Sequence, residues 1–274
     1  MPSAALPGVS TTSMKLIPSP SNDLVRLAAS ALLAIEENDL ELGKKSACRA
    51  ILDGYLEGLN AGGHPFVIGD QHRWFKPILQ DVSRDPGLYW DKLHALPRQR
   101  LPVPREAATF LAELLPSSKI HFHITHRIAG LGNLGKPRFT TLVEWNGGPV
   151  AREVKALTLS AAAWAANASD GPFYSQILAR SIRSADPFLK VHNRWIGRRL
   201  GPECGRIELV SFRRLKDQEW LLHAMGFETA NIHLGSAKPS ALRNHLHRLR
   251  PNWLRDAAAQ MHDLLLADFK QWRS

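Results

Sequence analysis

A run of glycines between two segments of alternating apolar residues limits the possible folds of this chain more than any other feature. The glycines are Gly130, Gly132 and Gly135, which gives the spacing G-x-G-x-x-G. Because glycine has no Cβ, backbone N–H groups in such a run can approach phosphate oxygens closely. Residues 120–128 and 138–145 alternate in apolar character, as β-strands do. The sequence therefore predicts a strand, a glycine-rich loop and a second strand.

The residues after the glycines distinguish between two kinds of phosphate loop. A dinucleotide-binding loop needs a helix after its glycines, but Pro137 and the β-branched residues that follow disfavour a helix. The other arrangement is kinase-like, with the glycine loop at a hairpin tip and a phosphate-binding lysine on the next strand. Lys155 follows a predicted turn at 146–149 and is the candidate lysine. The alternative is an ordinary turn between strands, with Lys155 at a solvent-facing strand end.

Length and cysteine content set the class of protein. With 274 residues, the chain can bury a substantial core and form one large domain or two lobes. Cys48 and Cys204 provide no disulfide framework, which fits a reducing compartment. The first residues have neither a basic start nor a sustained apolar stretch, and the apolar run 27–35 is too short to cross a bilayer. We therefore expect a cytoplasmic protein without a membrane segment.

Positive charge is concentrated in the C-terminal third of the chain. The net charge is +10, and residues 180–274 contain 17 Lys/Arg against 9 Asp/Glu. Such an excess favours an anionic ligand or partner, for example a nucleotide or a nucleic acid. The alternative is a solvated surface, and no recognised basic-aromatic module accompanies the charge. Direct nucleic-acid binding is therefore kept as an alternative only.

The order of the predicted elements indicates an α+β, protein-kinase-like fold, mostly helical with a small antiparallel sheet of four or five strands. Residues 1–21 are expected to be a disordered lead-in, and residues 22–274 the kinase-like domain. Within it, 22–118 form a helical part, 119–157 the glycine-loop hairpin and the lysine strand, and 158–274 further helices plus one strand near 206–215. The predicted helices cover residues 22–35, 45–59, 105–115, 160–167, 173–184, 218–234, 239–249 and 253–272.

Five segments of the chain resemble the motifs of a bacterial family. Residues 22–30 resemble W-D-L-x-R-L-A-x-S, and residues 127–138 resemble a loop of the form R-x-x-G-x-G-S-L-G-x-x-R. Residues 184–189, 212–216 and 230–233 are similar to the later blocks S-D-P-F-L, V-R-x-L-K and A-x-x-H, and order and spacing agree across about residues 22–272. On these motifs the chain resembles the family called domain of unknown function 2252, whose members look kinase-like.

The resemblance implies ATP as a cofactor and a set of residues that bind it, without assigning a catalytic residue. The implied nucleotide-binding residues are Gly130, Gly132, Asn133, Gly135, Arg138 and Lys155. Further candidate site residues are Arg127, Asp186, Arg213 and His233.

The chain also departs from the family pattern. Family members carry G-D-x-H-x-x-N and N-D-F-D segments upstream of the residue 22–30 motif, and these look like catalytic and metal-binding loops. We therefore expect an N-terminal truncation, with Mg²⁺ bound only if acidic ligands come from elsewhere. Residues 69–72 read Gly-Asp-Gln-His but lie after the helix they should precede, and we interpret them as a chance match. Ala156 replaces the family's acid after the lysine, which leaves Glu153 and Glu144 as the nearest acids.

Two further clusters have structural as well as functional interpretations. His121, His123 and His126 could begin a zinc site, but surface histidines on a strand are the default because no further ligands are near in sequence. Lys190, Arg194 and Arg198 have helical i, i+4, i+8 spacing, so a solvated basic helix face is favoured over a docking patch.

Together these features predict a truncated, pseudokinase-like protein that binds nucleotide and does not transfer phosphate independently. A separately encoded segment or protein partner could supply the missing loops. The alternatives are an active ATP-dependent phosphotransferase and a basic nucleic-acid-associated protein.

Overall fold

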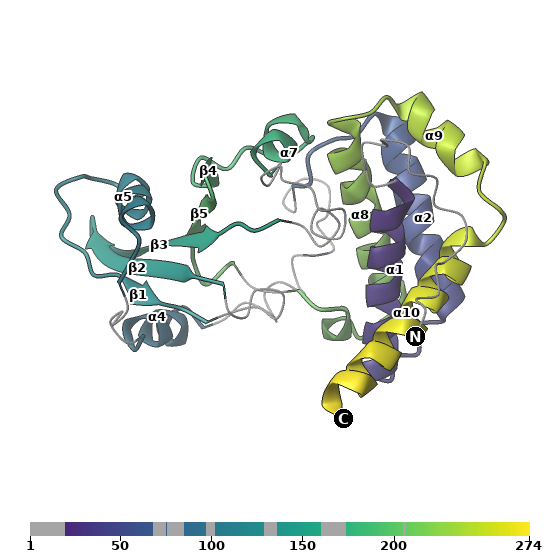
Figure 1. Ribbon diagram of the computed structural model, residues 1–274, viewed down its shortest axis with the longest axis horizontal. Helices are drawn as coiled ribbons and strands as arrows, with labels where there is room; N and C mark the ends of the chain where they lie inside the picture. The colour runs from purple at the N-terminus through teal and green to yellow at the C-terminus, as the bar shows by residue number, and fades with distance from the viewer. Residues whose placement is uncertain are drawn as a thin grey trace, which may run out of the picture.

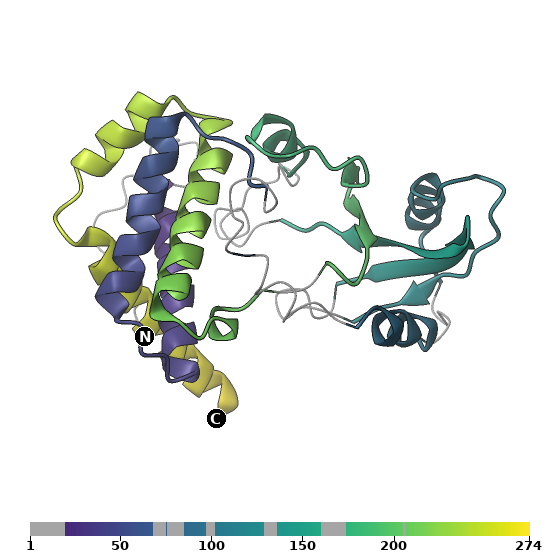
Figure 2. The same cartoon turned by 180° about the vertical axis from the view of Figure 1, so that it is seen from behind.

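The computed structural model describes residues 20–67, 75, 85–96, 102–128, 136–159, 174–204 and 207–274. These residues form two bodies, a bundle of long helices and a smaller part built around one β-sheet (Figures 1 and 2). The chain leaves the bundle after α2 (Lys44–Ala61), forms the sheet, and returns to the bundle at α8 (Leu215–Leu234).

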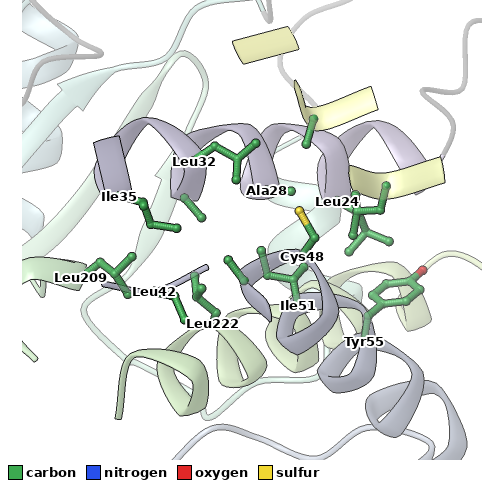
Figure 3. Close-up of a cluster of buried hydrophobic side chains, with 14 of the residues drawn as sticks. Leu24, Ala28, Leu32, Ile35, Leu42, Cys48, Ile51, Tyr55, Leu209 and Leu222 are labelled. Carbon is green, nitrogen blue, oxygen red and sulfur yellow. The ribbon is translucent and has the colours of Figure 1, made fainter. Parts of the chain in front are cut away.

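The bundle owes its stability to apolar stripes on its helices. Its other members are α1 (Pro20–Glu37), α9 (Pro239–His247) and α10 (Trp253–Arg273). Leu24, Ala28 and Leu32 recur at helical spacing on α1 and pack against Ile51 and Tyr55 of α2 (Figure 3). Within the described ranges, no helix combines the length and the apolar character needed to cross a membrane.

Two glycines let α2 and α8 approach each other closely. A Cβ on Gly54 would lie 1.9 Å from the carbonyl oxygen of His223, and a Cβ on Gly226 would lie 2.1 Å from the carbonyl oxygen of Ile51. Any larger residue at either position would therefore push the two backbones apart. These contacts explain why glycine, a poor helix former, occupies the middle of both helices.

The sheet contains five antiparallel strands in the order β1-β2-β3-β5-β4. The strands are β1 (Thr125–His126), β2 (Arg138–Trp145), β3 (Gly148–Ala156), β4 (Lys190–His192) and β5 (Trp195–Leu200). Asn146 and Gly147 form the β2–β3 turn with φ of 50° and 83°, the left-handed conformation that a two-residue hairpin favours. Asn193, with φ of 50°, lies in the turn between β4 and β5.

Helices α4 (Pro86–His94) and α5 (Arg105–Glu113) cover opposite faces of the sheet (Figure 1). Phe110 of α5 packs with Phe139 and Trp195 on one face. On the other face, Leu93 of α4 packs with Leu200 near one end of the strands. The opposite end of this second face carries the charged side chains described below.

Asn231 of α8 binds two chain segments, the one that leaves α2 and the one that follows α7. Its side-chain Nδ2 donates to the carbonyl oxygen of His64 (2.8 Å), and its Oδ1 accepts from the backbone N–H of His64 (3.2 Å). Its own carbonyl oxygen accepts from the backbone N–H of Ile182 (3.1 Å), just after α7 (Tyr174–Arg180). The buried amide is therefore bonded on both of its polar atoms.

The α+β class and the small antiparallel sheet of five strands are confirmed, whereas two local predictions are wrong. Residues 207–214 contain a 3₁₀ turn, Leu209–Ser211, in place of the predicted strand. Leu209 and Phe212 are three positions apart and both buried, a spacing that fits a 3₁₀ turn and not an alternating strand. The first predicted strand, expected from Ile120, is reduced to the two residues of β1. The predicted helix at 160–167 lies outside the described residues, and the kinase-like assignment and the truncation stay predictions.

Candidate anion-binding site

The end of the sheet next to the glycine-bearing segment is closed by a backbone hydrogen bond. The N–H of Arg127 donates to the carbonyl oxygen of Arg138 (3.2 Å), one step beyond the paired residues His126 and Phe139. The chain between these two arginines contains four of the predicted phosphate-binding residues, which lie outside the described part of the chain: Gly130, Gly132, Asn133 and Gly135.

The strand register brings predicted site residues onto one face. Arg138 of β2 lies directly opposite Lys155 of β3, and Thr140 lies opposite Glu153. On the other side of β3, Glu153 lies opposite Arg198 of β5. Because alternate residues of a strand point to the same face, Glu153 and Lys155 share a face with Arg138 and Arg198.

Glu153 is fully buried and binds three arginines. Its carboxylate lies 2.9 Å from Nη1 of Arg127, 3.2 Å from Nη1 of Arg138 and 2.7 Å from Nη2 of Arg198. Arg198 adds a second bond from Nε (2.8 Å) to the same oxygen. Removing a carboxylate from water is costly unless such charge-assisted bonds replace its solvation. Glu153 therefore fixes the positions of three guanidinium groups from three different parts of the sheet.

Lys155 differs from these arginines because no described residue serves as its anionic partner. Its ammonium group makes no hydrogen bond or ion pair with any residue that the structure describes, although the side chain is only partly exposed. The pKa of Lys155 is lowered, first by burial and then by the positive charges of Arg138 and Arg198, while Glu153 acts in the opposite direction. Lys155 therefore lies at a position that disfavours its charged form.

Among the described residues, four cations and one carboxylate give this end of the sheet a net positive charge. Arg138 and Lys155 are directly opposite each other, and like charges in that position destabilise a sheet. Glu153 already binds Arg138 and relieves only part of this repulsion. An anion bound beside Lys155 would relieve the rest, and planar guanidinium groups are suited to phosphate and carboxylate oxygens.

The predicted site residue Asp186 lies elsewhere and has a structural role. Its carboxylate accepts the backbone N–H of Phe188 (2.9 Å) and shapes the turn after Pro187. The ring of Phe188 then lies 4.3 Å from the guanidinium carbon of Arg152, which alternates with Glu153 and so faces the other side of the sheet. Asp186 is therefore not part of the group around Glu153.

Arg152 lines a shallow pocket of about 470 Å³ on that other face, together with Trp145 and Phe188. Its Nε donates to the carbonyl oxygen of Leu114 at the end of α5 (2.9 Å), and its Nη1 donates to the carbonyl oxygen of Ala151 (2.9 Å). A cation at a helix C-terminus satisfies carbonyl groups that lack helical partners. The main role of Arg152 is therefore to attach α5 to the sheet.

The predicted site residue His233 lies in the helix bundle. Its Nδ1 is 2.8 Å from the hydroxyl of Tyr55, and its Nε2 is 3.3 Å from the carboxylate of Asp23. These bonds join α8, α2 and α1. Desolvation raises the pKa of Tyr55, while the bond to His233 is the main cause that lowers the pKa of Asp23. His233 is therefore a structural residue of the bundle, and its ring is held by hydrogen bonds to two side chains rather than to the backbone.

The remaining predicted residues are not among the ion-pair partners that the structure gives for Glu153. Arg213 is exposed in the turn before α8. Residues 69–72 lie outside the described ranges. His121 and His123 precede β1 and are exposed, so their expected position on a strand is wrong. In the described part of the chain, no three His, Cys, Asp or Glu side chains gather closely enough to hold a metal ion.

The predicted position of Arg198 on a helix face is wrong. Lys190, Arg194 and Arg198 do not form a helical stripe, because Lys190 lies in β4, Arg194 in the turn and Arg198 in β5. The local signal for this hairpin is Asn193, which tolerates positive φ, between Val191 and the pair Trp195–Ile196. Trp195 Nε1 donates to Glu106 of α5 (3.2 Å), a contact that holds the hairpin on the helix.

Comparisons of the chain with protein-family models, with curated proteins and with solved structures found no match.

Proposed function

We propose that this chain binds a nucleotide, with ATP as the first candidate, in the manner of the kinase-like family that its sequence resembles. The nucleotide phosphates would lie between the glycine-bearing segment and the row formed by Arg138 and Lys155. The observation that carries the proposal is the position of Lys155, a partly buried cation with lowered pKa opposite another cation. Buried charges are normally paired, so a cation that lacks a counter-charge within the described residues is typical of a ligand site.

The proposal is limited to binding. Phosphoryl transfer needs carboxylates that hold Mg²⁺ and orient the attacking hydroxyl. In the part of the site that the structure describes, the carboxylate is that of Glu153, and its oxygens already bind three guanidinium groups. ATP turnover by the purified chain should therefore stay at background, and clear turnover would favour an active phosphotransferase instead.

Calorimetric titration with ATP, with and without Mg²⁺, tests the proposal. We predict saturable binding that Lys155→Met weakens about 10- to 100-fold, since a charge-assisted hydrogen bond contributes about 1.5–3 kcal/mol. Methionine keeps the apolar stem and removes the charge. The matched control is Lys190→Met, an exposed lysine whose register with Gly197 places it on the other face, and it should leave the affinity unchanged.

Two further ligands distinguish nucleotide binding from general anion binding. Tripolyphosphate should bind more weakly than ATP, and adenosine should bind weakly or not at all, if both the base and the phosphates are recognised. Binding to generic DNA with steep salt dependence, unaffected by Lys155→Met, would support the nucleic-acid alternative. Failure of ATP to bind at millimolar concentration, or equal affinity of the Lys155→Met variant, contradicts the proposal.

A further inference from the structure

The last helix continues beyond the bundle that holds its first half. Leu254, Ala258 and His262 of α10 are buried. His262 Nε2 lies 3.1 Å from Glu36, in the last turn of α1, so α1 ends level with His262. Every residue from Asp263 onward is exposed. The projecting part, which Figures 1 and 2 show leading to the C-terminus, is about 16 Å long at the usual helical rise.

The projecting part of α10 exposes large apolar side chains, three of which form a stripe along the helix. Five large apolar side chains between 39% and 80% exposed occur within nine residues: Leu264, Leu265, Leu266, Phe269 and Trp272. Leu265, Phe269 and Trp272 have i, i+4, i+7 spacing and therefore lie on one side of the helix. This is the same side as that of the buried residues in the first half of α10. The rings of Phe269 and Trp272 stack with centroids 6.0 Å apart. A contiguous apolar patch of this kind marks an interaction surface.

The projecting residues lack the packing that stabilises the rest of the helix. The packed first half of α10 already nucleates the helix, but none of the residues from Asp263 to Arg273 is buried, and most helical stability in proteins comes from packing. The covering partner should therefore offer a second apolar stripe of similar length.

The order of charges along the helix favours a second copy in antiparallel orientation. Asp263 and Asp268 come before Lys270 and Arg273. A parallel copy would bring like charges together, whereas an antiparallel copy brings the acids of one helix to the bases of the other. This arrangement also directs the basic helix tip toward the partner's α1–α2 turn, where exposed Glu37, Asp39 and Glu41 lie level with the point at which α10 leaves the bundle.

We propose that residues 263–273 of α10 pair with the same segment of a second copy, forming a symmetric antiparallel homodimer. A two-fold axis makes the contact self-complementary, so one apolar stripe serves both protomers. The proposal does not depend on nucleotide binding. The net charge of +10 opposes association, so the dimer depends mainly on the apolar stripe; added salt should change its stability little, because salt screens this repulsion as well as the acid–base pairs.

Sedimentation velocity of the full chain between 1 and 100 µM tests this arrangement. The expected species has twice the chain mass of 30.5 kDa. Phe269→Glu places a charge in the stripe and should weaken dimerisation at least 100-fold. The control is Leu88→Glu, because Leu88 on α4 is 61% exposed and lies away from α10. Circular dichroism should show that both variants stay folded, since neither position is buried.

Charge reversal tests the orientation of the pair. Asp263→Lys and Arg273→Asp should each weaken the dimer, and the double variant should restore it, because the antiparallel arrangement exchanges the two signs. A monomer at 100 µM overturns the proposal, as does a dimer that Phe269→Glu leaves intact. A monomer that binds phosphatidylserine vesicles through Phe269 would assign the stripe to a membrane surface instead.

Discussion

Replacing Glu153 with glutamine should destabilise the sheet, because one buried carboxylate holds three cations. Glutamine has the same size but lacks the negative charge, and the variant leaves the guanidinium groups of Arg127, Arg138 and Arg198 without a counter-charge. The loss of the counter-charge affects the three arginines to different degrees. The side chains of Arg138 and Arg127 are 7% and 19% exposed, whereas that of Arg198 is 46% exposed and can turn into solvent.

The expected loss can be derived from these exposures. Removing one partner of a buried ion pair costs about 3–5 kcal/mol, whereas an exposed pair contributes about 0–1 kcal/mol. Arg138 behaves as the buried partner and Arg198 as the exposed one. Because the glutamine amide oxygen still accepts a hydrogen bond, we expect Glu153→Gln to lower the free energy of unfolding by about 3 kcal/mol. Arg198→Gln should lower it by about 1 kcal/mol or less.

Urea denaturation followed by circular dichroism measures both variants against the parent chain. With a slope of about 3 kcal/mol/M, a 3 kcal/mol loss moves the midpoint by about 1 M. Hydrogen exchange of the β3 amides provides a local reading if the bundle and the sheet unfold separately. A Glu153→Gln midpoint no lower than that of Arg198→Gln would refute the role assigned to Glu153.

Contacts within the helix bundle lead to two further predictions. The pKa of Asp23 is lowered, mainly by the hydrogen bond with His233, so its contribution is present above the unfolded pKa and disappears as pH falls through the folded value. The stability difference between the parent chain and Asp23→Asn should thus shrink below about pH 4 in urea titrations. Gly226→Ala should lower the free energy of unfolding by about 2–3 kcal/mol, because its Cβ would clash with the backbone of Ile51. Gly43→Ala is the control: a Cβ there would have its nearest neighbour at 4.0 Å, so the thermal midpoint should fall for Gly226→Ala and change little for Gly43→Ala.

Local patterns were sufficient to predict most helices and one hairpin. The apolar spacing of residues 24–35 matches the buried side of α1, and Gly62, with φ of 74°, ends α2 close to the predicted position. The Asn146–Gly147 turn is also confirmed. These elements depend on neighbouring residues only, so a single sequence contains the information that specifies them.

The charged group on the sheet could be anticipated only in part. Sequence spacing suggested Glu153 as an acid near Lys155, but not that arginines from positions 127, 138 and 198 would occupy its oxygens. Their convergence depends on strand register across distant segments. The error at Arg198 has a related cause, because cations at i, i+4 and i+8 fit a helix face as well as a short hairpin.

The bonds of Asn231 have a consequence for movement between the two bodies. The segment leaving α2 and the segment following α7 are both attached to the same residue of α8. The chain that returns from β5 through residues 207–214 enters the same helix at Leu215, so this link also leads to α8. Any relative movement of the sheet and the bundle that keeps these hydrogen bonds must therefore leave His64 and Ile182 in place beside α8.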